Sequence, residues 1–187
     1  MEAASWARTT TTQRSSRLLD LLMEASAALD LDVAEAVLEE AATSHLDAWT
    51  PHIRHDPDAV PTLTALRERG YKIGLLSNTH WPRAYHERFL ERDGLVDLID
   101  VRVYTSEIDW TKPHPAAFRA VLDALDVADP GACVFVGDRP YDDIRGAQQA
   151  GMRAVHRPNP ALPAGAVTPD AVITSLPELL PLVDGWR

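Results

Sequence analysis

The sequence predicts an α/β protein in which a three-layer parallel sheet follows a short helical segment. From residue 58 onward, short apolar runs alternate with amphipathic stretches of helical period, the order that builds a parallel sheet covered by helices. Before residue 58, two amphipathic stretches follow each other with no apolar strand between them, which indicates a helical hairpin. We therefore expect residues 1–57 to be helical and residues 58–187 to form the α/β part.

The helical part has two predicted helices. Apolar residues recur at three- and four-residue steps over residues 16–29. Asp32, with Glu35 three residues later, is the expected start of a second helix that fades near Trp49. His52 and His55 follow in a proline-containing loop, where solvated histidines are expected rather than a metal pair.

In the α/β part, each element has a local signal. Gly70 and Gly151 are expected to end helices, and Ser175 with Glu178 forms a capping box that starts the last one. The predicted helices cover residues 58–69, 82–92, 116–125 and the stretch from Pro140 to Gly151, and the predicted strands cover residues 71–79, 99–103, 134–136, 153–157 and 170–174.

Composition restricts the functional classes. The 187 residues carry 18 basic and 28 acidic side chains, a net charge of −10 with a pI near 5.0. Nucleic acid is therefore not an expected partner, because phosphate backbones are bound by basic faces. No apolar run reaches the length of a membrane span, and the single cysteine, Cys133, fits a reducing compartment. We expect a cytoplasmic protein, and the sequence carries no signal of its oligomeric state.

Polar residues follow three of the predicted strands or their connections. Ser77, Asn78 and Thr79 end the first strand, where they could bind an anion or simply cap the next helix. Lys112 stands directly before Pro113, which holds it on rigid backbone, although a lone lysine is usually a solvated surface charge.

The most informative stretch is Val134-Phe135-Val136-Gly137-Asp138, followed by Asp142 and Asp143. Three acids so close repel one another unless a cation lies among them, and carboxylate oxygens suit Mg²⁺. The alternative is an acid that caps a helix and favours its dipole. Parallel strands bring their carboxyl ends to one edge of the sheet, so the hydroxyl, the lysine and the acids together predict a site for a phosphate held with a metal.

These motifs resemble those of the haloacid dehalogenase-like (HAD) hydrolases. Leu75-Leu76-Ser77-Asn78-Thr79 is similar to the second motif of that superfamily, Thr111-Lys112-Pro113-His114-Pro115 to the third, and Val136-Gly137-Asp138 with Asp142 and Asp143 to the fourth. The resemblance covers roughly residues 58–187. It implies a Rossmann-like core, with the preceding helices as part of a small cap.

The resemblance also implies roles. Ser77, helped by Asn78 and Thr79, would bind the phosphoryl oxygens, and Lys112 would neutralise the phosphate and the nucleophile. Asp138 would bind Mg²⁺. Asp143, or alternatively Asp142, would support the metal shell or pair with Lys112. The implied reaction is Mg²⁺-dependent hydrolysis of a small phosphorylated metabolite through an aspartyl-phosphate.

One departure from the family is large. Its first motif, a strand ending in Asp-x-Asp, should precede the cap, and the nearest text, Asp30-Leu31-Asp32-Val33, continues a helix instead. We expect a truncated chain that lacks the nucleophile, is inactive by itself and is marginally stable, because the strands beside the absent one lose ladder partners. The alternatives are a non-catalytic HAD-like module that binds a phosphate or a partner, and a haloacid dehalogenase, which needs no metal.

Overall fold

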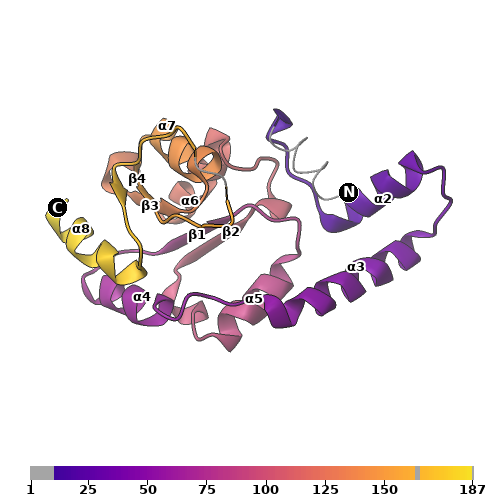
Figure 1. The fold of residues 1–187 in the computed structure, drawn as a ribbon, viewed down its shortest axis with the longest axis horizontal. Helices are drawn as coiled ribbons and strands as arrows, with labels where there is room; N and C mark the ends of the chain where they lie inside the picture. Colours follow the sequence, from indigo (N-terminus) through magenta and orange to yellow (C-terminus); the bar gives the residue numbers. More distant parts are fainter. Residues whose placement is uncertain (1–10, 163–164, 187) are drawn as a thin grey trace. The chain divides into compact units, whose positions relative to one another are not determined.

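In a computed structural model of the chain, residues 11–162 and 165–186 are described, and their elements follow the predicted alternation (Figure 1). The helices and strands are α2 (Leu18–Ala28), α3 (Glu35–Trp49), α4 (Ala59–Glu68), β1 (Gly74–Ser77), α5 (Arg83–Arg92), β2 (Val101–Tyr104), α6 (Pro115–Ala124), β3 (Val134–Gly137), α7 (Gly146–Gln149), β4 (Arg153–His156), β5 (Ala171–Val172) and α8 (Leu179–Gly185). A π-helical turn, Pro140–Arg145, joins β3 to α7.

The chain forms two compact units, described here one at a time. The helical unit holds the residues up to His55 together with Ser77–Val96 and Tyr104–Thr111. The sheet unit holds Asp56–Leu76, Asp97–Val103 and the residues from Lys112 onward.

The strands form two sheets. In one, β1 pairs with β2; in the other, the order is β3-β4-β5 and all pairs are parallel. The register places Val134 opposite Arg153 and Gly137 opposite His156, so β3 and β4 end level with each other. The residues that follow these two strands are therefore neighbours at the carboxyl edge of the sheet.

Helices cover both faces of the three-stranded sheet. On one face, Leu66 of α4 and Val183 of α8 pack in one buried cluster with Val155 of β4 (Figure 1). On the other face, the ring of Phe118 of α6 lies 5.2 Å from the ring of Phe135 of β3, centroid to centroid. The sheet unit therefore has the predicted three-layer arrangement.

Helix ends agree with the local signals at the two expected glycines and differ at one acid. Gly70 and Gly151 end helices with φ of 82° and 86°, values that glycine adopts without a side-chain clash. The expected cap at Asp32 is wrong, because the helix begins at Glu35 with Ala34 as its N-cap. The turn before it is closed by a backbone hydrogen bond from Leu31 N–H to the Ser26 carbonyl, and no side chain caps the helix at Ala34.

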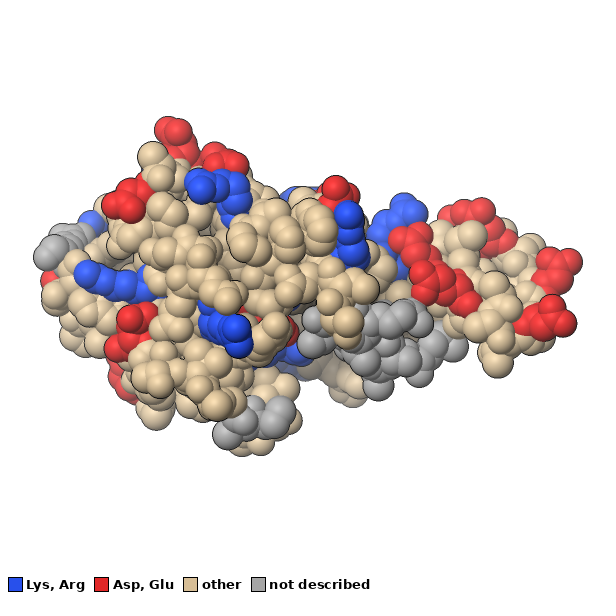
Figure 2. All heavy atoms as spheres, turned by 90° about the horizontal axis from the view of Figure 1, so that it is seen from above, with Lys and Arg blue, Asp and Glu red and all other residues tan. Residues whose placement is uncertain are grey.

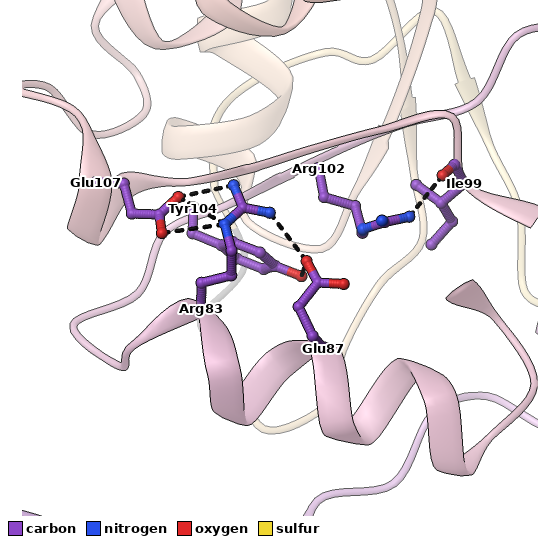
Figure 3. Close-up of polar contacts among 6 residues, drawn as sticks. All are labelled: Arg83, Glu87, Ile99, Arg102, Tyr104 and Glu107. Carbon is purple, nitrogen blue, oxygen red and sulfur yellow. Dashed lines mark hydrogen bonds and ion pairs between the residues drawn. The ribbon is translucent and has the colours of Figure 1, made fainter. Parts of the chain in front are cut away.

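In the helical unit, α2 and α3 pack through buried Leu18, Ala42 and Leu46, and Trp81 and Tyr85 lie against this cluster. An arginine fork then ties α5 to the turn after β2. The Arg83 guanidinium donates to both oxygens of Glu107 at 2.7–3.0 Å and to Glu87 at 2.9 Å (Figure 3). These ion pairs connect the start of α5, which follows the Ser77–Thr79 segment, to the turn after β2.

Candidate active site

The acid-rich loop after β3 is organised around Asp143. The Asp143 carboxylate accepts the backbone N–H groups of Asp138 and Arg139 at 3.1 and 3.0 Å. Gly137 is required beside it, because a Cβ on that residue would lie 2.4 Å from the Cβ of Asp143. The Gly-Asp junction at the end of the strand therefore lets a buried carboxylate fold back and fix the loop.

The second partner of Asp143 is Lys112. Its Nζ lies 2.7 Å from Asp143 Oδ1, with side chains only 9% and 4% exposed, and it also donates to the carbonyl of Leu76 at 3.0 Å. In such a dry setting, each charge depends on the other for its stability. Of the two roles expected for Asp143, the structure shows the pairing with Lys112.

Asp138 points to a different neighbour. Asp138 Oδ2 accepts a hydrogen bond from Asn159 Nδ2 at 3.0 Å, and His156 Nε2 lies 3.3 Å from the Asp138 carbonyl oxygen. Asn159 was not among the site residues predicted from the sequence. Its signal was the end of β4, since a polar residue just past the strand next to β3 reaches the same edge.

Asp142 is a partly buried carboxylate whose negative charge is only partly offset by neighbouring cations. Its side chain is 17% exposed, and Arg139 Nη1 stands 3.6 Å from Asp142 Oδ2. Burial raises the pKa of Asp142, and the nearby Asp143 charge adds to that rise, while Arg139 opposes it. A bound cation would relieve this cost.

The donors at this edge fit Mg²⁺ in chemistry. In the described part of the chain, no group of three His, Cys, Asp or Glu side chains is set to hold a metal. Asp143 is paired with Lys112, and Asp138 and Asp142 are the other two carboxylates of this loop. Two carboxylates are sufficient in principle, because Mg²⁺ in proteins usually keeps waters and takes substrate phosphate oxygens as its other ligands.

Ser77, Asn78 and Thr79 lie in the helical unit, where they line a pocket of about 240 Å³ with Trp81, His86 and other residues. The Thr79 hydroxyl lies 3.0 Å from Trp81 N–H and 2.9 Å from His86 Nε2. Thr79 N–H in turn donates to Thr105 Oγ1 at 2.9 Å. Thr79 therefore shapes the segment after β1 from a buried position.

His86 is a half-buried aromatic residue of this pocket. Its ring stacks on Tyr104 with centroids 4.7 Å apart, and burial lowers the pKa of His86 to about 4. The imidazole is neutral at pH 7 and can serve the Thr79 hydroxyl only as a hydrogen-bond partner. Both polar and aromatic side chains therefore line the pocket beside Ser77.

The sequence-predicted residues fall into two groups. The structure brings Lys112, Asp138, Asp142 and Asp143 together in the sheet unit, while the segment from Ser77 to Thr79 belongs to the helical unit. Lys112 reaches the carbonyl of Leu76, the residue that precedes Ser77 in the chain.

A match to a protein-family model identifies the family of this chain. The model described as haloacid dehalogenase-like hydrolase matches residues 5–151. The chain belongs to the HAD-like hydrolases. The motifs identified at Ser77, Lys112 and Asp138 all lie within the matched residues.

Individual relatives agree with this family. A glyceraldehyde 3-phosphate phosphatase of Methanopyrus kandleri is 33% identical over 139 residues, which are 74% of this chain and 57% of that protein. This chain spans about half the length of the curated relatives it matches.

Two solved structures share the fold. An HAD phosphatase from Thermococcus onnurineus matches with a TM-score of 0.65 and 32% identity, over 86% of this chain and 69% of that one. A 2-haloacid dehalogenase from Pseudomonas syringae pv. Tomato DC3000 matches with a TM-score of 0.70 and 30% identity, over 91% and 73%. The predicted Rossmann-like α/β class is confirmed.

Charge and hydropathy add two further observations. In Figure 2, acidic and basic side chains are mixed over the left part of the face, whereas the right end carries mostly acidic ones. Within the described residues, no helix combines the length and the apolar character that crossing a membrane requires.

Proposed function

We propose that this chain provides the phosphate- and metal-binding part of a Mg²⁺-dependent phosphatase that acts on small phosphorylated metabolites. The observation that carries the proposal is the buried Lys112–Asp143 pair beside Asp138 at the end of β3. A buried ammonium that already pairs with one carboxylate suits a group that must meet further anions, because burial strengthens each charge interaction.

Each residue would act on a defined atom. Ser77, with Asn78 and Thr79, would donate hydrogen bonds to the phosphoryl oxygens, and Lys112 would neutralise the charge that builds up during transfer. Asp138 would be a metal ligand, Asp142 a second one, and Asp143 would hold Lys112 and the loop in place. When bound, Mg²⁺ would neutralise the phosphate and so favour attack on phosphorus.

The proposed reaction transfers the phosphoryl group to an aspartate and then to water. The sequence lacks the Asp-x-Asp strand that supplies this aspartate in the family. We therefore propose that these 187 residues bind phosphate and Mg²⁺ but do not complete hydrolysis. The helices of residues 1–57 would form part of a cap, and residues 58–187 the core.

Haloacid dehalogenation is the second candidate. The likeness to the Pseudomonas syringae 2-haloacid dehalogenase favours it, whereas the acids Asp138 and Asp142 favour a metal and hence phosphate. A non-catalytic phosphate-binding or partner-binding module is the third, favoured by the missing Asp-x-Asp strand.

Titration of the chain with phosphate, with and without Mg²⁺, tests the proposal. Phosphate should bind only when Mg²⁺ is present, and Asp138→Asn should abolish this Mg²⁺-dependent binding of phosphate. The matched control is Asp123→Asn, which removes a carboxylate from an exposed helix position, 66% accessible, and should change nothing. Phosphate binding that ignores Mg²⁺ would contradict the proposed metal site, and hydrolysis of p-nitrophenyl phosphate by this chain would contradict its proposed inactivity.

A further inference from the structure

The hydroxyl of Thr79 links the segment after β1 to the helix α5. Thr79 is buried, and its Oγ1 accepts the backbone N–H of Trp81 at 3.0 Å and lies 2.9 Å from Nε2 of His86, a residue of α5. Within residues 11–162 and 165–186, this hydroxyl has no other hydrogen-bond partner. The hydroxyl proton can therefore form a hydrogen bond only with His86.

The direction of this hydrogen bond fixes the tautomer of His86. In a neutral imidazole, one ring nitrogen donates and the other accepts. If Nε2 carried the proton, Thr79 Oγ1 would accept two N–H groups, and its own proton would be buried without an acceptor, which is unfavourable. We therefore place the proton on Nδ1 and assign Nε2 as the acceptor. Burial lowers the pKa of His86 to about 4, which keeps the ring neutral at pH 7.

Aromatic neighbours hold the His86 ring in place. Tyr104 stacks on it at an interplanar angle of 12°, and the rings of Trp81 and Phe89 each lie 6.2 Å from it, centroid to centroid. Rotation of the ring away from Thr79 would disturb all three contacts. The acceptor nitrogen is therefore kept at a defined position.

The backbone of Thr79 is held separately from its side chain. The Thr79 N–H donates to Thr105 Oγ1 at 2.9 Å, and the Thr105 hydroxyl donates back to the Thr79 carbonyl at 3.2 Å. Ser77 and Asn78 directly precede Thr79, and they line the same pocket as His86. Any change in how Thr79 is held therefore reaches the two residues that would meet a phosphoryl group.

We propose that His86 is a positioning residue of the anion site. By accepting the Thr79 hydroxyl proton at Nε2, it holds the Ser77–Thr79 segment in the conformation that receives a phosphoryl group. This inference rests on the proposed function, in which Ser77 and Asn78 bind that group. A packing role would need only an aromatic ring at this position, whereas the positioning role needs an acceptor atom where Nε2 lies.

Three substitutions separate the acceptor from the ring. His86→Phe keeps a ring without an acceptor, His86→Gln brings a carbonyl oxygen close to the place of Nε2, and His86→Asn carries the same group on a side chain too short to reach Thr79. With Mg²⁺ present, His86→Phe and His86→Asn should weaken the binding of inorganic phosphate about fivefold, the factor that one net hydrogen bond contributes. His86→Gln should recover most of this loss.

Two measurements on the ligand-free chain test the positioning role without phosphate. Nitrogen-15 NMR of the imidazole at pH 7 should show a protonated Nδ1 and an unprotonated Nε2. Amide hydrogen exchange at Trp81 should be about fivefold faster in His86→Phe and His86→Asn than in the unmodified chain, and His86→Gln should slow it again. The control is His52→Gln, at an exposed position, which should change neither phosphate affinity nor this exchange.

Contrary results overturn the inference in separate ways. A protonated Nε2 at pH 7 would reverse the hydrogen bond and remove the acceptor. Equal behaviour of His86→Phe and His86→Gln, in phosphate affinity or in exchange, would make His86 a packing residue. If the unmodified chain binds no phosphate with Mg²⁺, the proposed function is overturned, while the expected tautomer and exchange rates would still support His86 as the residue that holds the segment.

Discussion

The segments at the ends of β3 and β1 are both held by side-chain contacts, but the contacts at β3 are between charged groups and those at β1 are between neutral groups. After β3, a lysine and a carboxylate are buried together, and the loop is fixed because the carboxylate also accepts two backbone N–H groups. After β1, neutral hydroxyls meet an uncharged histidine that is stacked on a tyrosine. Buried charges demand exact partners, whereas hydroxyls tolerate rearrangement.

The difference lies in what each end can lose. Removing one charge at the end of β3 leaves the other charge buried without a partner, which lowers the stability of the fold strongly. Removing a hydroxyl after β1 leaves neutral neighbours that rearrange at lower cost. Four measurements test this difference between the two strand ends.

Replacing Lys112 should have the largest effect. Lys112→Met keeps the length of the side chain but leaves Asp143 buried and charged, which should lower the free energy of unfolding by about 3–5 kcal/mol. Urea denaturation measures it. The double variant Lys112→Met with Asp143→Asn should lose less than the sum of the two single losses, and a double-variant loss equal to that sum would show that the pair is not coupled.

Filling the space at Gly137 should come next. Gly137→Ala forces a methyl group to within 2.4 Å of Asp143 Cβ, and the loop must shift. We expect a loss of about 2–3 kcal/mol, as in other overpacked sites. Gly185→Ala is the control, because a Cβ there meets nothing within 4 Å. If both variants unfold at the same urea concentration, the close approach of Asp143 is not needed.

The pH dependence of stability tests the end of β1. The pKa of His86 is lowered from 6.5 to about 4 in the folded chain, so the unfolded chain takes up the proton first as the pH falls. This contribution to stability is complete above about pH 6.5 and declines towards pH 4, by about 1–2 kcal/mol in total. Urea midpoints at pH 7 and pH 5 measure it.

His86→Phe keeps a ring against Tyr104 but cannot titrate, so it should flatten that decline. His52→Gln, at an exposed position, should leave the decline unchanged. A decline that persists in His86→Phe would assign the titration to another group.

The smallest expected effect is at Asn159. Its bond to Asp138 is exposed, so Asn159→Ala should change stability by less than about 1 kcal/mol. Under the proposed function, Mg²⁺ affinity should fall several-fold, because the carboxylate loses the group that orients it. Calorimetric Mg²⁺ titration of both proteins measures this, with unchanged affinity as the contradictory result.

Much of the fold could be predicted because its signals are local. Gly70 and Gly151 mark helix ends through the one backbone conformation that suits them, and the capping box of Ser175 and Glu178 is present as expected. The predicted start at Asp32 is wrong because capping residues locate a helix end only to within a few residues, and this helix begins at Glu35 with Ala34 as its N-cap.

The candidate site was only partly predictable. Spacing identified Lys112, Asp138 and Asp143 as one group, but the sequence could not assign Asp143 rather than Asp142 to Lys112. That choice depends on which carboxylate folds back under Gly137. Asn159 was not predicted because it lies 21 residues from Asp138 in the sequence. The two residues come together only through the pairing of β3 with β4.

The Lys112 ammonium has a mechanical consequence. Its Nζ donates a hydrogen bond to the Leu76 carbonyl of β1 at 3.0 Å and forms an ion pair with Asp143, in the loop after β3, at 2.7 Å. A single amine therefore connects two strands that belong to separate sheets. An anion that attracts this ammonium would weaken its contacts with the Leu76 carbonyl and Asp143. We therefore expect anion binding to change the stiffness of the sheet unit, which a force probe attached across β1 and β3 would measure.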